Sequence, residues 1–128
     1  MPKIIYEELS KKIIGYAITV HKIVGPGFLE NVYEQSLCVE LKLNKIPFTR
    51  QKMYSVFYKS YVVGKYLADI EVANKIIVEL KSVFYINRNM EAQLLNYLHV
   101  SNIRVGYVIN FRNSILEFKR FVNTAAKT

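Results

Sequence analysis

Two carboxylates and one ammonium group lie close together in the middle of the sequence. Asp69 is part of Tyr61–Val72, a segment rich in β-branched and aromatic residues. Glu79 and Lys81 belong to the next segment of this kind, Ile76–Val83. Such segments are typical of strands, and because side chains alternate along a strand, Glu79 and Lys81 share one face of theirs. In a hairpin, the three charged groups would meet on adjacent strands.

The turn between the two strands decides whether the carboxylates meet. A two-residue turn at Asn74-Lys75 would pair Asp69 with Leu80 and place Glu79 on the opposite face. A three-residue loop, Ala73-Asn74-Lys75, pairs Asp69 with Glu79 on one face instead. We predict the three-residue loop.

Two carboxylates in that position repel each other unless a cation lies between them. Hard oxygen ligands suit Mg²⁺ or Mn²⁺, with water molecules completing an octahedron. Such a metal polarises a phosphoryl oxygen and acidifies a bound water, which Lys81 is placed to orient. The alternative is an ordinary surface pair of Glu79 and Lys81, and the spacing alone favours this alternative.

The surrounding segments predict a mixed α/β domain. Two amphipathic helices are expected at about residues 10–24, with Ser10 as N-cap, and 28–43; Gly25-Pro26-Gly27 separates them. A third helix, capped by Asn87 or Asn89, follows the first three of five strands. The expected strands are Tyr54–Tyr58, Tyr61–Val72, Ile76–Val83, Val105–Phe111 and Ile115–Val122. This order indicates one sheet flanked by helices, in a single domain that covers residues 1–128.

Composition and charge narrow the class of protein. Eighteen Lys and Arg residues against ten Asp and Glu give a net charge of +8, which attracts polyanions but also fits a plain solvated surface. Cys38 is the only cysteine, which excludes an internal disulfide and a multi-cysteine zinc site. The sequence contains no run of 18 apolar residues, so no membrane span is predicted, and its N-terminal residues lack the pattern of a secretory signal. We expect a cytoplasmic protein that does not contact membranes.

Residues 27–33, Gly-Phe-Leu-Glu-Asn-Val-Tyr, form a G-x-x-E-x-x-Y motif. Further short motifs follow in order, at Gln51, Tyr58-Lys59, Gly64, Asp69, Glu79-Leu80-Lys81, Gln93-Leu94-Leu95-Asn96-Tyr97 and Asn110-Phe111. Together, from about Ser10 to Val122, they resemble the GxxExxY proteins of the PD-(D/E)XK nuclease superfamily. Ala68 stands where the superfamily has a proline, which takes no part in metal ligation.

The resemblance implies a restriction-endonuclease-like α/β core, a central mixed β-sheet flanked by helices. It implies that Asp69, Glu79 and Lys81 form the catalytic motif, joined by Glu30. It also implies that Asp69, Glu79, Glu30 and the Leu80 carbonyl hold Mg²⁺ or Mn²⁺. Without the resemblance, Glu30 is explained as a carboxylate that stabilises the first turn of its helix.

Three further residues are candidates for positioning a substrate: Tyr33, Gln93 and Tyr97. Gln93 and Tyr97 lie four residues apart on one helix face and are similar to the Q-x-x-x-Y motif of RecB-type nucleases. The alternative is a solvent-facing strip with a half-buried tyrosine. Tyr33 shares a helix face with Glu30, and its alternative role is in the core.

The leading prediction is a divalent-metal-dependent nuclease that hydrolyses phosphodiester bonds, in DNA rather than RNA. A second hypothesis is a module of the same fold that binds nucleic acid without cutting it. A third is a small interaction subunit, either a homodimer or the partner of another protein.

Overall fold

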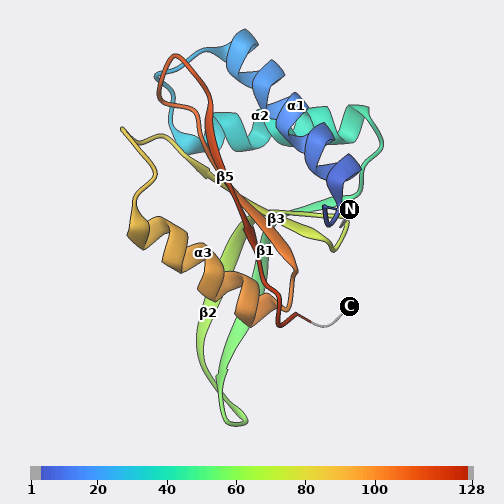
Figure 1. Cartoon of the computed structure of the whole chain (residues 1–128), viewed down its shortest axis with the longest axis vertical. Coiled ribbons are helices and arrows are strands. Elements are labelled where there is room, and N and C mark those ends of the chain that lie inside the picture. The colour runs from blue at the N-terminus through green and yellow to red at the C-terminus, as the bar shows by residue number, and fades with distance from the viewer. Residues whose placement is uncertain (1–3, 127–128) are drawn as a thin grey trace.

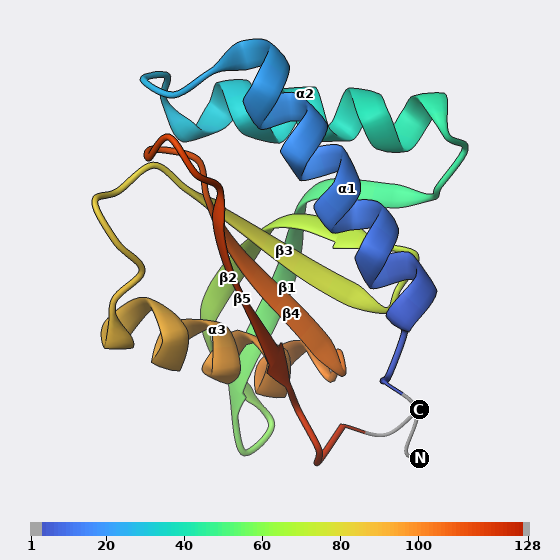
Figure 2. The same cartoon turned by 45° about the horizontal axis from the view of Figure 1, so that its top comes forward.

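The computed structural model describes residues 4–126, in which three helices pack against a five-stranded sheet. Helices α1 (Glu7–Val24) and α2 (Glu30–Leu43) cover one face, and α3 (Arg88–Ser101) covers the other (Figures 1 and 2). The strands keep their sequence order along the sheet: β1 (Phe48–Tyr58), β2 (Tyr61–Val72), β3 (Ile76–Lys81), β4 (Val105–Asn110) and β5 (Glu117–Val122). Neighbouring strands are antiparallel except β3 and β4, which are parallel and connected through α3. The predicted α/β class, a mixed sheet flanked by helices, is confirmed.

Two apolar cores lie on the two faces of the sheet. Ile76, Val78 and Leu80 of β3 pack toward α1 and α2, whereas Ile77 packs toward α3. All six residues of β4 are buried, as expected for a strand covered on both faces. Glu79 is therefore a charged residue in a strand that is otherwise interior.

The starts of α1 and β1 differ most from the prediction because distant partners set them, whereas the ends of the other elements lie within two residues of the predicted ones. Helix α1 begins at Glu7, and Ser10 is not its N-cap but a buried residue inside it. The Ser10 hydroxyl accepts a hydrogen bond from Arg120, a partner 110 residues away that no local capping signal reveals. Strand β1 begins at Phe48, six residues before the predicted start, because its first residues pair with β2. Of the two predicted caps of α3, Asn87 is the one used, and its side chain accepts a hydrogen bond from the Met90 N–H.

The β1–β2 hairpin projects from the body of the molecule past α3 (Figures 1 and 2). We call residues 51–68 of this hairpin the β1–β2 arm. Within residues 4–126, none of the helices combines the length and the apolar composition needed to span a bilayer.

Helix α3 packs tightly on β4 at Gly106. A Cβ atom added to Gly106 would lie 3.0 Å from Leu98 Cδ2 and 3.1 Å from Leu94 Cδ1. Gly106→Val is therefore expected to push α3 outward and to lower the free energy of unfolding by about 1–3 kcal/mol in a urea titration. Gly15→Ala is the matched control, because a Cβ atom at Gly15 would have no neighbour within 4 Å. Since Gly15 lies in a helix, the alanine should raise the free energy of unfolding by up to about 1 kcal/mol. Equal stability of the Gly106→Val and wild-type proteins would contradict this packing.

Candidate active site

The two predicted catalytic carboxylates meet at the end of the β2–β3 hairpin. The register pairs Ile70 with Val78 and Val72 with Ile76, which leaves Ala73, Asn74 and Lys75 as the loop. The predicted three-residue loop is thus confirmed, and Asp69 falls opposite Glu79. Ala73 and Asn74 both adopt left-handed conformations, with φ of 54° and 57°.

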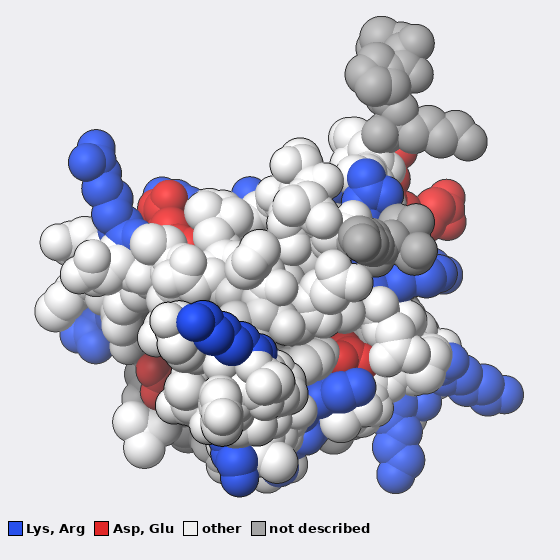
Figure 3. All heavy atoms as spheres, turned by 90° about the horizontal axis from the view of Figure 1, so that it is seen from below, with Lys and Arg blue, Asp and Glu red and all other residues white. Residues whose placement is uncertain are grey.

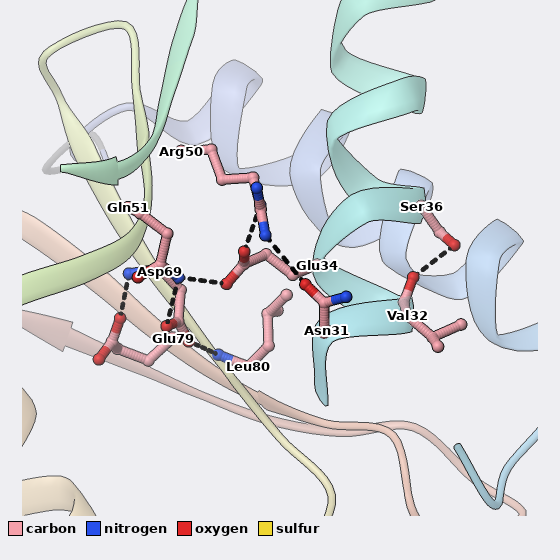
Figure 4. Close-up of polar contacts among 9 residues, drawn as sticks. All are labelled: Asn31, Val32, Glu34, Ser36, Arg50, Gln51, Asp69, Glu79 and Leu80. Atoms are coloured by element: carbon pink, nitrogen blue, oxygen red, sulfur yellow. Dashed lines mark hydrogen bonds and ion pairs between the residues drawn. The ribbon is translucent and has the colours of Figure 1, made fainter. Parts of the chain in front are cut away.

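Side chains continue the hydrogen bonding where the main-chain pairing of β2 and β3 ends. The Asp69 N–H donates to Glu79 Oε2 at 2.8 Å, and the Leu80 N–H donates to Asp69 Oδ2 at 2.9 Å (Figure 4). The N–H of Asp69 therefore orients the Glu79 carboxylate. The N–H of Leu80, the residue after Glu79, orients the Asp69 carboxylate. The pair is held in place before any ligand arrives.

An irregularity in β2 coincides with Asp69. Ala68 packs in the core beneath α3, whereas Ile70 packs in the core beneath α1 and α2. In a regular strand, residues two apart lie on the same face, so the alternation shifts at Asp69. On β1, Gln51 has a φ of 53° at the same level of the hairpin.

Burial makes the ionised pair costly. Glu79 is only 7% exposed, and this burial, together with the charge of Asp69, raises its pKa to about 8. Burial likewise raises the pKa of Asp69, opposed by the Leu80 N–H and by the charge of Lys81. Lys81 is half-buried and lowers the pKa of both carboxyl groups through its charge. With Glu79 protonated, the charge of Lys81 balances that of Asp69. Ionising Glu79 as well would create an excess of negative charge that a cation would neutralise.

Helix α2 contributes two glutamates near Asp69. Glu30, at the start of the helix, is exposed, and its charge raises the pKa of Asp69. Glu34, one turn later, is buried and accepts hydrogen bonds from Arg50 and from Gln51 Nε2, the latter at 2.8 Å. Gln51 Nε2 also lies 3.5 Å from Asp69 Oδ1, so Gln51 links α2 to the carboxylate pair (Figure 4).

The sequence analysis assigned no role to Glu34, Arg50 or Gln51. The i, i+4 spacing of Glu30 and Glu34 could have indicated that both face the same neighbour. The ion pair of Glu34 with Arg50, however, joins residues 16 positions apart on a helix and a strand. Only the packing of α2 against β1 makes it visible.

The donor set fits a hard divalent cation that keeps several water ligands. Asp69 and Glu79 offer carboxylate oxygens, with Glu30 close enough to influence Asp69. Within residues 4–126, no three His, Cys, Asp or Glu side chains are grouped closely enough to enclose a metal ion. Two carboxylates leave most positions of an octahedral cation to water or to a ligand, a coordination that Mg²⁺ accepts.

Tyr33 lies in the core rather than at a substrate surface. Its side chain is fully buried and stacks on Phe111 with a centroid distance of 4.5 Å. Its hydroxyl donates to the Gly25 carbonyl at 2.7 Å and accepts from the Phe28 N–H at 3.1 Å. Of the two roles left open for Tyr33, substrate positioning and core packing, these contacts favour the core: the buried hydroxyl is engaged on both sides and fixes the turn that precedes α2.

Tyr33→Phe is accordingly expected to act on stability. The Phe111 stack would remain, but the Gly25 carbonyl and the Phe28 N–H would lose their shared partner. The free energy of unfolding should fall by about 1–3 kcal/mol, measured by urea denaturation. An unchanged stability combined with a raised KM in a cleavage assay would instead restore the substrate-positioning role.

The structure brings Tyr97 of α3 near the carboxylate pair. Its ring stacks on Tyr66 with centroids 3.4 Å apart, and burial together with the charges of Glu79 and Asp69 raises its pKa. Tyr66 is buried beside Glu79, and its hydroxyl makes no hydrogen bond of good geometry. Gln93, one turn before Tyr97, is exposed. Tyr97 is thus adjacent to the pair, and Gln93 lies at the solvent side of the same helix.

Comparisons with known proteins place this geometry in context. Residues 7–121 match the sequence model of the PD-(D/E)XK nuclease superfamily. The crystal structure of SSO0001 has a similar fold, with a TM-score of 0.58 and 18% sequence identity over 91% of this chain and 59% of that one. This chain thus spans less than two thirds of the SSO0001 chain, and at this identity the likeness concerns the fold alone. No curated protein sequence matches the chain, and the narrower resemblance to GxxExxY proteins rests on the motifs.

Proposed function

The chain belongs to the PD-(D/E)XK nuclease superfamily, and from this premise we propose that it hydrolyses phosphodiester bonds, in DNA rather than RNA, with Mg²⁺ or Mn²⁺. The observation that carries the proposal is the pair of Asp69 and Glu79. The Asp69 N–H and the Leu80 N–H orient the two carboxyl groups, and burial raises the pKa of both. Such a pair is costly without a cation and is suited to hold one.

Each residue of the motif has a distinct role in this proposal. Asp69, Glu79, Glu30 and the Leu80 carbonyl would hold the cation, which when bound supplies Lewis-acid polarisation of a phosphoryl oxygen and a more acidic water. Lys81 is near both carboxylates, where its ammonium can orient the attacking water and offset charge on the phosphate. Tyr97, fixed by its stack on Tyr66, and Gln93, one turn earlier on α3, would position the substrate.

The surface charge supports a nucleic-acid substrate. The β1–β2 arm contains Lys52, Lys59 and Lys65 but no Asp or Glu, and it starts and ends beside the carboxylate pair, at Gln51 and Ala68. Viewed from the end of the molecule shown in Figure 3, Lys and Arg side chains project on several sides, with fewer Asp and Glu between them. Together with the net charge of +8, this distribution favours a polyanion.

The test is cleavage of labelled single- and double-stranded DNA and RNA by the purified chain, with Mg²⁺, Mn²⁺ or EDTA. Asp69→Asn keeps an oxygen to accept the Leu80 N–H but removes the charge that holds the cation, so cleavage should disappear. Metal-dependent cleavage that survives in the Asp69→Asn/Glu79→Gln double variant would refute the proposal.

A non-catalytic nucleic-acid-binding module is the second candidate. It is favoured by one observation, that the side chains around the pair within residues 4–126 do not form a cluster of three metal ligands. This candidate predicts salt-sensitive DNA binding without cleavage in any of the metals, with an affinity that Asp69→Asn leaves unchanged.

A further inference from the structure

A hollow of about 470 Å³ lies between the turn before α2 and the segments that follow β3 and β4. One wall is the turn before α2, with Phe28, Leu29 and Glu30, and the other is formed by Ser82 and Arg112. Glu30 is close enough to raise the pKa of Asp69. The hollow therefore shares Glu30 with the surroundings of Asp69, and its Ser82 directly follows Lys81 of the proposed catalytic motif.

The walls of the hollow are tied together by hydrogen bonds. The Ser82 hydroxyl donates to the Phe28 carbonyl at 3.1 Å, across 54 residues of sequence. The Phe28 N–H donates to the Tyr33 hydroxyl. On the other wall, Asn110 bonds both the N–H and the carbonyl of Val83, and Asn113 donates to the Phe84 carbonyl at 2.9 Å. Because these bonds connect all three chain segments, the hollow is formed before a ligand binds.

Arg112 places a positive charge on the rim of the hollow without an acidic partner. Its guanidinium lies 3.9 Å from the centroid of the Phe84 ring, a stacking contact that orients the group without neutralising it. In the part of the chain that the structure describes, no Asp or Glu forms an ion pair with it. Phe84 and the neighbouring Tyr85 are 71% and 67% exposed.

The two ends of the hollow thus differ in chemistry. The Glu30 end is negative, the Arg112 end is positive, and the exposed side chains of Phe28 and Leu29 lie between them in a lining that is otherwise mostly polar. A planar group joined to a phosphate could pack against Phe28 and Leu29 while its phosphate contacts Arg112. The volume is within the range of pockets that take small molecules of this size.

We propose that this hollow binds one nucleotide of the substrate strand next to the bond that is cut, with its phosphate at Arg112 and its base against Phe28 and Leu29. This inference deepens the proposed function and rests on it for the identity of the strand. A base can enter a hollow only when it has left its stack. The substrate class is therefore single-stranded nucleic acid, or a duplex with an unpaired end, and exposed Phe84 and Tyr85 offer further stacking surfaces for such a strand.

Binding is measured in EDTA, where no cleavage occurs, by fluorescence anisotropy of a labelled 12-nucleotide DNA strand and of the same sequence as a duplex. We expect wild type to bind the single strand more tightly than the duplex. Arg112→Ala should weaken single-strand binding about tenfold and reduce the slope of log K against log salt by about 0.7, the loss of one phosphate contact. Lys75→Ala is the matched control, because it also removes one exposed positive charge but at the opposite end of β3 from the hollow. Lys75 directly precedes β3, whereas Ser82 of the hollow directly follows it.

Equal effects of Arg112→Ala and Lys75→Ala on single-strand binding would overturn the inference. As a check that needs no variant, thymidine monophosphate added to the wild-type protein should shift the amide resonances of Gly27, Ser82 and Arg112. Shifts confined to the β1–β2 arm would also overturn it.

The outcomes separate this inference from the proposed function. If wild type cleaves DNA and Asp69→Asn does not, while Arg112→Ala binds and cleaves normally, the function stands and the nucleotide site fails. If wild type does not cleave in any metal but Arg112→Ala loses single-strand binding, the nucleotide site stands and the nuclease activity fails.

Discussion

Glu79→Gln is expected to lower metal-dependent cleavage by about a thousandfold, equivalent to about 4 kcal/mol of transition-state stabilisation. The glutamine oxygen can still accept the Asp69 N–H, so the hairpin geometry is retained, but the charge that attracts the cation is lost. The measurement is the single-turnover cleavage rate of wild type and variant at saturating Mg²⁺. Calorimetric titration with Mn²⁺ should show weakened metal binding in the same variant.

Glu71→Gln provides the matched control for this prediction. Glu71 is also a buried glutamate beside the same hairpin, 3% exposed, but it pairs with Lys52 and with the Tyr54 hydroxyl rather than with Asp69 or Glu79. Its replacement should leave the cleavage rate close to that of wild type. If the two variants lose the same activity, the effect is a general consequence of disturbing the hairpin and the assignment of Glu79 as a metal ligand fails.

The stability of the metal-free protein is expected to fall as the pH rises from about 4.5 to about 8. Below this range Glu79 is protonated in both the folded and the unfolded chain. Within it, the unfolded chain releases the proton near the ordinary pKa of 4.5, whereas burial beside Asp69 keeps it bound in the folded chain up to about pH 8. The folded state therefore binds more protons, and the free energy of unfolding decreases with pH by roughly 3–5 kcal/mol before levelling off.

Urea titrations in EDTA at several pH values test this dependence. The raised pKa values of Asp69 and Glu34 act in the same direction, so Glu79→Gln isolates the contribution of Glu79. The variant should be more stable than wild type by a margin that grows from pH 4.5 to 8, and Mg²⁺ should narrow the margin at pH 8 by stabilising wild type. A margin that is constant over this range, or that shrinks as the pH rises, would show that Glu79 is ionised in the folded metal-free protein.

The loss of cleavage in Glu79→Gln and the fall in stability of the metal-free protein with pH have one physical origin. The same burial that raises the pKa of Glu79 also strengthens its interaction with a bound cation, because fewer water molecules screen the charge. Stability lost in the metal-free state is therefore expected to accompany activity gained in the metal-loaded state, as in other sites that hold like charges together.

Features that depend on neighbouring residues were predictable from the sequence. The length of the Ala73-Asn74-Lys75 loop determined the register of the hairpin, and the register brought Asp69 opposite Glu79. The asparagine cap of α3, with Asn87 and Asn89 as the candidates, and the position of β4 also followed from local patterns. In each case the deciding interactions lie within about ten residues, so spacing and side-chain type are sufficient.

The roles of individual residues near the pair depended on the tertiary structure. Glu30 and Tyr33 share one turn of α2, yet Glu30 is exposed beside Asp69 whereas Tyr33 is buried against Phe111, 78 positions later in the sequence. Periodicity shows that two residues share a helix face, but it does not show which neighbour covers each of them. Periodicity therefore left both a substrate role and a core role open for Tyr33, whose hydroxyl holds the Gly25–Phe28 turn.

By itself, the sequence determined the fold class, the pairing of Asp69 with Glu79 and the charge that favours a polyanion, since turn length, alternation and composition are local or additive properties. Only the tertiary structure decided that Gln51 links Glu34 to Asp69 and that Arg112 and Phe28 face one hollow. These arrangements join side chains that are 17 to more than 80 residues apart in the chain. They exist because helices and strands pack in one particular way, and packing is a property of the whole core rather than of any segment.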